Sequence, residues 1–144
     1  MKQKGFATLE VILMVMVIGI LASIAVPRFS TMTAAANTAR IQADLSTIDT
    51  AIAVYYLDKG TNPGSLDDLK DYFQGQTAPT PPTGKYYLNG TIQDEELTAQ
   101  SKYGITGSGS DARACLEGTT YTAEQFYVTD KGGGNSGGVT GGVG

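Results

Sequence analysis

Histidine and cysteine, which carry many catalytic and metal-binding sites, are nearly absent from this 144-residue chain. It contains no histidine and a single cysteine, Cys115, so a single copy cannot form Ser-His-Asp triads, Cys-His pairs or the common zinc sites. Cys115 is most simply interpreted as a small, partly buried apolar residue. Any chemistry would have to use carboxylates, hydroxyls or lysines, and we expect no catalytic site, no metal and no cofactor.

Three motifs in the second half of the chain could still form sites. Asp94-Glu95-Glu96 could belong to a calcium site, but its spacing matches no calcium loop, and a solvated acidic turn explains it. Asn89-Gly90-Thr91 fits a glycosylation sequon, yet Asn-Gly as a tight turn explains it without modification. The segment GITGSGSDAR lacks a phosphate-binding or dinucleotide fingerprint, so we expect a loop there.

One carboxylate is unusual because of its position. Glu10 is the only charged residue between Phe6 and Pro27. That segment has the length of a membrane span, which needs about 20 apolar residues, and a carboxylate at membrane depth costs about 2 to 3 kcal/mol unless it is paired or near the interface. Lys2 and Lys4 precede it, which predicts an N-terminus in the cytoplasm and the remaining chain outside.

Three interpretations of this N-terminal segment compete. A secretory signal peptide would be cleaved near Ser23-Ile24-Ala25, and a plain membrane anchor would stay uncut, but neither explains Glu10. In the third interpretation the chain is cut after Gly5, which gives Phe6 a free amino group one helical turn from Glu10 on the same face. A Glu10 carboxylate that meets a neighbour's Phe6 amine would remove two uncompensated charges from the apolar phase and set an axial register.

These residues resemble a known family. Lys4-Gly5-Phe6, Thr8-Leu9-Glu10, the apolar run and Pro27-Arg28-Phe29 are similar to the N-terminus of bacterial type IV pilins and of the pseudopilins of type II secretion and competence systems. The resemblance implies that a prepilin peptidase cuts between Gly5 and Phe6 and methylates the Phe6 amine, and that Glu10 acts in filament assembly. It is close over about the first 30 residues and loose to about Leu57, and Ala7 departs mildly from the threonine of many relatives.

The segment after Pro27 changes from aliphatic to small and polar residues. Pro27 would kink or loosen a continuing helix because it removes one backbone hydrogen bond. The resemblance implies that the helix continues and can unwind there in the filament. Further on, apolar residues at steps of four and three predict an amphipathic helix that packs on a sheet: Ile41, Leu45, Ile48, Ile52 and Tyr55. We also expect Arg40 and Asp44 to form an i,i+4 pair.

The remaining residues predict short elements. The turn-forming run Lys59–Gly64 should end the long helix, and Ser65 should cap a short helix that reaches about Phe73. Asn89-Gly90, between Lys85–Leu88 and Thr91–Ile92, predicts a hairpin. Further strands are expected around Tyr103–Thr106 and Tyr121–Thr129.

The expected fold class is α+β and type IV pilin-like, with a long N-terminal helix whose C-terminal half packs on a small antiparallel sheet of three or four strands. The chain would divide into five parts. These are a cytoplasmic leader (1–5), a transmembrane and filament-core half of the helix (6–27), an amphipathic half (28–58), a globular domain (59–131) and a flexible glycine-rich tail (132–144).

The formal net charge is −4 and no basic cluster follows the first four residues, which argues against a nucleic-acid module. We therefore expect a structural subunit, a major pilin of a type IV pilus, that forms a homo-oligomeric helical filament for adhesion, twitching motility or DNA uptake. The expected partners are the prepilin peptidase, the inner-membrane assembly machinery and, before assembly, membrane lipid. It would move from the cytoplasmic membrane to an extracellular filament. The alternatives are a secretion or competence pseudopilin and a membrane-anchored binding or enzymatic domain.

Overall fold

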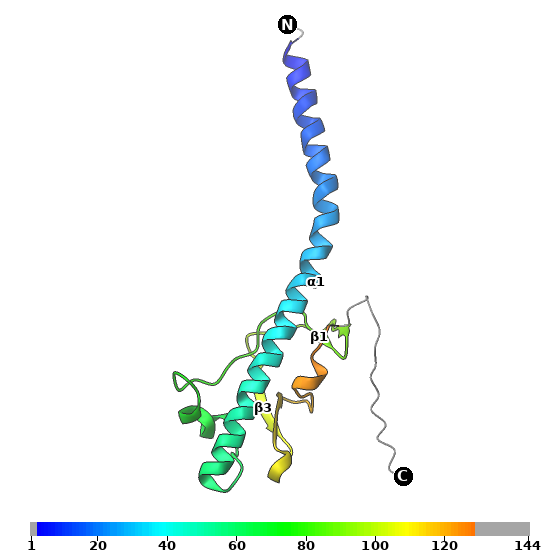
Figure 1. Cartoon of the computed structure of the whole chain (residues 1–144). Helices are drawn as coiled ribbons and strands as arrows, with labels where there is room; N and C mark the ends of the chain where they lie inside the picture. The colour runs from blue at the N-terminus through cyan, green and yellow to red at the C-terminus, as the bar shows by residue number, and fades with distance from the viewer. Residues whose placement is uncertain (1–2, 129–144) are drawn as a thin grey trace, which may run out of the picture.

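The computed structural model describes residues 3–128, and one helix dominates it. Helix α1 comprises Gln3–Lys59, and its 57 residues correspond to a length of about 85 Å at 1.5 Å per residue. The first half of α1 extends alone, and the second half lies along a small globular region (Figure 1). The fold class expected from the sequence is confirmed. The tail expected over 132–144 lies outside the described residues.

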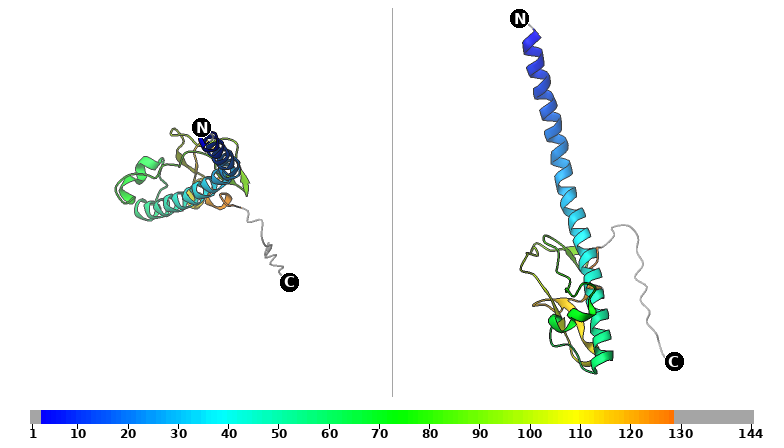
Figure 2. Two further views of the ribbon diagram at one scale, coloured as in Figure 1. Left: turned by 90° about the horizontal axis from the view of Figure 1, so that it is seen from above. Right: turned by 90° about the vertical axis from the view of Figure 1, so that its left-hand side faces the viewer.

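Helix α1 continues through Pro27, as the resemblance implies. The two halves of the helix point in different directions, and the change is gradual (Figure 2). The hydroxyls of Ser23, Thr31 and Thr33 donate to carbonyl oxygens about one turn earlier, at 2.7 to 2.9 Å. Such side-chain bonds to the helix backbone often accompany bent helices.

The predicted apolar stripe of α1 is confirmed and forms the core. Ile41, Leu45 and Ile48 are fully buried, Ile52 is nearly so, and the stripe extends back to Ala34 by the same helical steps. It packs against buried side chains of the elements that follow, namely Leu69, Phe73, Tyr86, Leu88, Leu97, Tyr103, Ala114, Leu116 and Phe126. Since these residues come from η1, β1, β3, β4 and the loops between and after them, α1 is the support on which the globular part is built.

The helix ends where the turn-forming residues predict. Gly60 donates its N–H to the Tyr56 carbonyl at 2.8 Å and takes a φ of +73°. This left-handed backbone conformation ends many helices, and glycine adopts it without strain. A 3-10 helix, η1 (Leu66–Tyr72), follows with Ser65 as its N-cap, so the predicted short helix is confirmed in place. The Asp68 carboxylate accepts the Ser65 N–H at 3.1 Å and fixes this start.

Strands β1 (Tyr87–Leu88) and β2 (Thr91–Ile92) form the hairpin that the sequence predicts. Asn89 and Gly90 have φ values of +50° and +75°, the backbone conformation of a two-residue turn for which Asn-Gly is the preferred sequence. The tight turn therefore explains this dipeptide.

A second hairpin pairs β3 (Tyr103–Thr106) with β4 (Arg113–Leu116) in antiparallel register, with Tyr103 opposite Leu116. Its connection contains the 3-10 turn η2 (Gly109–Asp111). Gly107, at a φ of +81°, is required here because a Cβ atom would lie 2.4 Å from the Asp111 carbonyl oxygen.

Two expectations about the sheet are wrong. Within residues 3–128 the strands form two separate two-stranded sheets, β1–β2 and β3–β4. Outside these strands, one isolated bridge pairs Gly84 with Leu97 in the described chain. The strand expected at Tyr121–Thr129 is replaced, over its described part, by the 3-10 turn η3 (Ala123–Gln125). This turn brings Phe126, which is fully buried, into the core against Tyr86.

Candidate assembly helix and its anchorage

The first half of α1 presents an unbroken apolar surface. Phe6 is 77% exposed, and the large apolar side chains from Leu9 to Ile24 are each about half to two thirds exposed. Soluble monomers rarely expose continuous apolar patches larger than a few hundred Å². Among the described helices, α1 is long and apolar enough to cross a membrane. Lipid or other protein chains must cover this surface.

Gly5, Phe6 and Glu10 lie within this surface. Phe6 and Glu10 are separated by one helical turn, and both side chains are exposed. Glu10 forms no ion pair with any of residues 5–25 or 28–128. A Cβ atom added to Gly5 would meet nothing within 4 Å, so the fold of one copy does not require glycine there. Contacts among the described residues therefore do not explain these three residue types.

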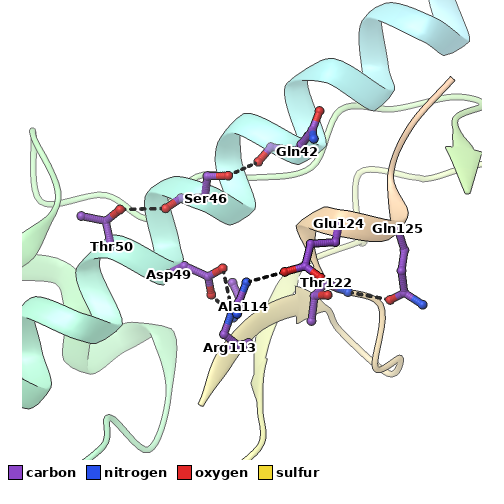
Figure 3. Close-up of polar contacts among 9 residues, drawn as sticks. All are labelled: Gln42, Ser46, Asp49, Thr50, Arg113, Ala114, Thr122, Glu124 and Gln125. Carbon is purple, nitrogen blue, oxygen red and sulfur yellow. Dashed lines mark hydrogen bonds and ion pairs between the residues drawn. The ribbon is translucent and has the colours of Figure 1, made fainter. Parts of the chain in front are cut away.

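The second half of α1 carries carboxylates that accept hydrogen bonds from distant parts of the chain. Asp49 points at strand β4, where it accepts the Ala114 N–H at 2.6 Å and the Arg113 Nε–H at 3.1 Å (Figure 3). Arg113 in turn donates to Glu124 of η3 at 3.3 Å. The Asp49 carboxylate raises the pKa of the Arg113 guanidinium. Helix, strand and η3 are thereby tied at one point.

Asp44 makes the corresponding contact with strand β3. It accepts the Tyr103 hydroxyl at 3.0 Å and lies 3.7 Å from Arg40, so the predicted i,i+4 pair is confirmed. Burial, and then the neighbouring Asp44 carboxylate, raise the pKa of Tyr103. Together, Asp44 and Asp49 fasten both strands of the second hairpin to the helix.

The other candidate residues lie in the globular region. Asp94, Glu95 and Glu96 are exposed, and within residues 3–128 no group of three or more acidic, histidine or cysteine side chains is placed to hold a metal ion. Cys115 is buried in β4, which raises the pKa of its thiol. Asn89 is exposed at its turn.

Sequence reasoning missed the role of Asp49 and Arg113 and did not predict strand β4. A signal was present, because Asp44 and Asp49 directly flank the buried stripe at Leu45 and Ile48, where a carboxylate needs a partner. The sequence does not say which distant backbone group or side chain supplies that partner.

Comparison with known proteins gives consistent relatives. The type II secretion system core protein G of Klebsiella michiganensis is 30% identical over 123 residues, which covers 76% of this chain and 84% of that protein. The type IV major fimbrial protein FimA of Dichelobacter nodosus is 31% identical over 134 residues, which covers 83% and 81%. Core protein G of Escherichia coli is 29% identical over 92 residues, and that match spans 64% of this chain and less than two thirds, 63%, of the relative.

No protein-family model matches the chain. No solved structure matches it either.

Proposed function

Because the chain belongs to the family of type IV pilins and type II secretion pseudopilins, we propose that it is a structural subunit, a major pilin, of a type IV pilus filament. The observation that carries this proposal is the free first half of α1, an apolar rod whose only charge between Phe6 and Pro27 is Glu10. Copies of the same rod can bury that surface against one another. The relatives are structural proteins by name, and we assign no enzymatic activity.

Two steps would prepare the rod for assembly. A prepilin peptidase cuts between Gly5 and Phe6 and methylates the new Phe6 amine. The absence of a steric need for glycine at position 5 supports this, because a small residue at a cleavage site leaves room for a protease. The Phe6 amine then meets the Glu10 carboxylate of a neighbouring copy. Leaving either charge unpaired in an apolar environment would cost several kcal/mol, so the pair favours assembly in one register.

Before assembly the subunit would wait in the cytoplasmic membrane as a single-pass protein with its N-terminus in the cytoplasm. Lipid covers α1 at this stage, and an inner-membrane machinery moves the subunit into an extracellular filament. The filament would serve adhesion, twitching motility or DNA uptake. A subunit of a type II secretion or competence pseudopilus is the second candidate, because the relatives include core protein G as well as FimA.

Two measurements on one preparation test this proposal. Surface material is sheared from cells, its fibres are imaged by electron microscopy, and the subunit is identified in them by mass spectrometry. We expect fibres whose subunit begins at N-methylated Phe6. A chain that starts at Met1 or at Val26, or surface material without the subunit, would contradict it. A subunit with the methylated N-terminus that stays in short periplasmic assemblies would favour the pseudopilin.

A further inference from the structure

The second hairpin has two edges, and its register shows which backbone groups face outward. The Glu117 N–H donates to the Lys102 carbonyl at 2.9 Å, and these two residues continue the pairing of β3 with β4. In an antiparallel ladder every second residue exchanges hydrogen bonds with the partner strand. Tyr103 and Ile105, which alternate with the bonded positions, therefore point their N–H and C=O groups away from β4.

The outer edge of β4 is satisfied by the protein itself. The Ala114 N–H donates to the Asp49 carboxylate at 2.6 Å, and the Leu116 N–H donates to the Tyr121 carbonyl at 3.3 Å. Both outward donors of this strand thus have partners. This edge is closed by α1 and by the chain that leads to η3.

The outer edge of β3 is not satisfied. Within residues 3–128, nothing accepts the N–H of Tyr103 or Ile105 and nothing donates to their carbonyls. Tyr103 is 3% exposed as a whole residue, and Ile105 is half-buried. An edge strand with unpaired N–H and C=O groups is a ready template for pairing with another chain. The outer edge of β3 therefore has no protein partner among the described residues and can accept an added strand.

An open cavity of about 610 Å³ runs along this edge. It is lined by Lys102–Thr106 and by the segments Gly64–Asp67 and Ala78–Thr80. Cys115 of β4 and Glu117–Thr119 after it also line the cavity, so it reaches over the hairpin as well as along the edge of β3. Inside β3, a Cβ atom on Gly104 would meet nothing closer than 3.6 Å, so the fold itself does not require glycine there. A glycine within a strand often marks a place where another backbone approaches closely.

We propose that this groove receives residues 129–144 of a neighbouring copy, which add to the outer edge of β3 as an extended strand and tie one subunit to the next. This inference rests on the proposed filament. The segment consists almost entirely of small residues, TDKGGGNSGGVTGGVG, which suits a narrow groove beside a strand edge. At about 3.3 Å per extended residue it reaches about 50 Å, enough to cross to an adjacent subunit.

The position of the chain's exit favours a neighbour over the same copy. Gly90 donates its N–H to the Tyr127 carbonyl at 3.1 Å, so the last described residues lie against the β1–β2 hairpin. In the view of Figure 1, that hairpin lies to the right of α1, whereas η1, which borders the groove, lies to its left. Helical filaments join different surfaces of successive copies, which brings one side of a subunit to the opposite side of the next. Glycine-rich strands bind weakly, and the high local concentration in a filament offsets this.

Disulfide trapping between two kinds of subunit tests the inference. In a Cys115→Ala background, one subunit carries Thr106→Cys at the end of β3 and the other carries a single cysteine placed in turn at each of residues 138–143. The two are expressed together, and sheared filaments are oxidised and analysed for covalent dimers. We expect dimers whose yield alternates with a period of two residues along 138–143. As a matched control, Thr91→Cys in strand β2 replaces Thr106→Cys and should give background yield.

A second variant tests the hydrogen bonds directly. Ile105→Pro removes the outward N–H, while the β3–β4 ladder stays intact, because proline is tolerated on an edge strand. We expect it to lower the dimer yield several-fold, whereas Ile105→Ala, which keeps the N–H, should lower it much less. Equal yields at all positions, or dimers absent from intact filaments because the groove holds only water, would each overturn the inference. So would a bond that forms only within one copy when a single subunit is given both cysteines. If wild-type cells make no filaments, the proposed function fails and the inference fails with it.

Discussion

Residues 6–24 and 34–55 belong to the same helix but differ in what covers them. In the first stretch the large apolar side chains are all exposed, whereas in the second a stripe of them from Ala34 to Ile52 is buried by the chain's own later elements. The backbone is the same, so the side chains make the difference. Apolar residues on all sides of a helix require an apolar surrounding, and a single stripe requires one packed face.

The carboxylates show the same contrast. Asp44 and Asp49 each bind a group on a distant strand, whereas Glu10 forms no ion pair with residues 5–25 or 28–128. On this helix, acids of the domain half are satisfied within one copy. The acid of the free half has no such partner among those residues.

The largest effect on stability should come from the core stripe. Ile48→Ala removes a fully buried side chain and should lower the free energy of unfolding of the domain by about 2 to 5 kcal/mol, since it leaves a cavity. Ile18→Ala, the same change at a position that is 64% exposed, should leave domain stability nearly unchanged. Denaturant unfolding of the full chain in detergent, followed by tyrosine fluorescence, measures both.

If Ile18→Ala destabilises the domain as much as Ile48→Ala, the two halves do not behave as the structure indicates. Leu45→Ala gives an independent check, because Leu45 is also fully buried.

A smaller loss is expected at the link between α1 and β4. Asp49→Ala leaves the Ala114 N–H without its acceptor and should lower the free energy of unfolding by about 1 to 3 kcal/mol. Glu124→Ala removes the outer member of the same network, whose side chain is 78% exposed, and should change stability by about 0.5 kcal/mol or less. Similar losses for the two variants would show that Asp49 acts only as a surface charge.

The smallest effect is expected at Tyr103, and it should depend on pH. The folded state raises the pKa of this phenol above its ordinary value near 10, so the folded state favours the neutral phenol. The contribution of the neutral phenol to the free energy of unfolding is therefore fully present below pH 10. The contribution is lost as the pH rises above 10. Tyr103→Phe should cost about 1 kcal/mol at neutral pH and should flatten the loss of stability above pH 10.

Thermal unfolding between pH 7 and pH 11 compares the two proteins. Tyr86 also has a raised pKa because of burial, so some alkaline loss should remain in the variant. An unchanged slope above pH 10 would contradict the assigned role of the Tyr103 hydroxyl.

Local sequence signals located most elements correctly. The steps of four and three from Ile41 predict the buried stripe, Asn89-Gly90 predicts the first hairpin, and Ser65 predicts the start of η1. Each depends on neighbours in the chain. The error at Tyr121–Thr129 has a different origin, because the need to place Phe126 in the core overrides a local preference for extended backbone.

Long-range features were not predictable in the same way. Strand β4 and the partner of Asp49 depend on contacts across about 65 residues of sequence, which no local spacing encodes. For the first half of α1 the sequence predicts an exposed apolar helix with one carboxylate, and the structure has that surface. That Glu10 pairs with the Phe6 amine of another copy stays a prediction.

The most direct test of the central claim replaces Glu10 and counts filaments. Glu10→Ala should leave the protein in the membrane and the domain folded, but it should abolish or strongly reduce filaments, because the Phe6 amine of the next copy loses its partner. Glu10→Asp, which keeps the charge on a shorter side chain, should retain more assembly than the alanine variant. Electron microscopy of sheared material, with membrane levels measured in parallel, gives the result. Normal filaments from Glu10→Ala would contradict the account.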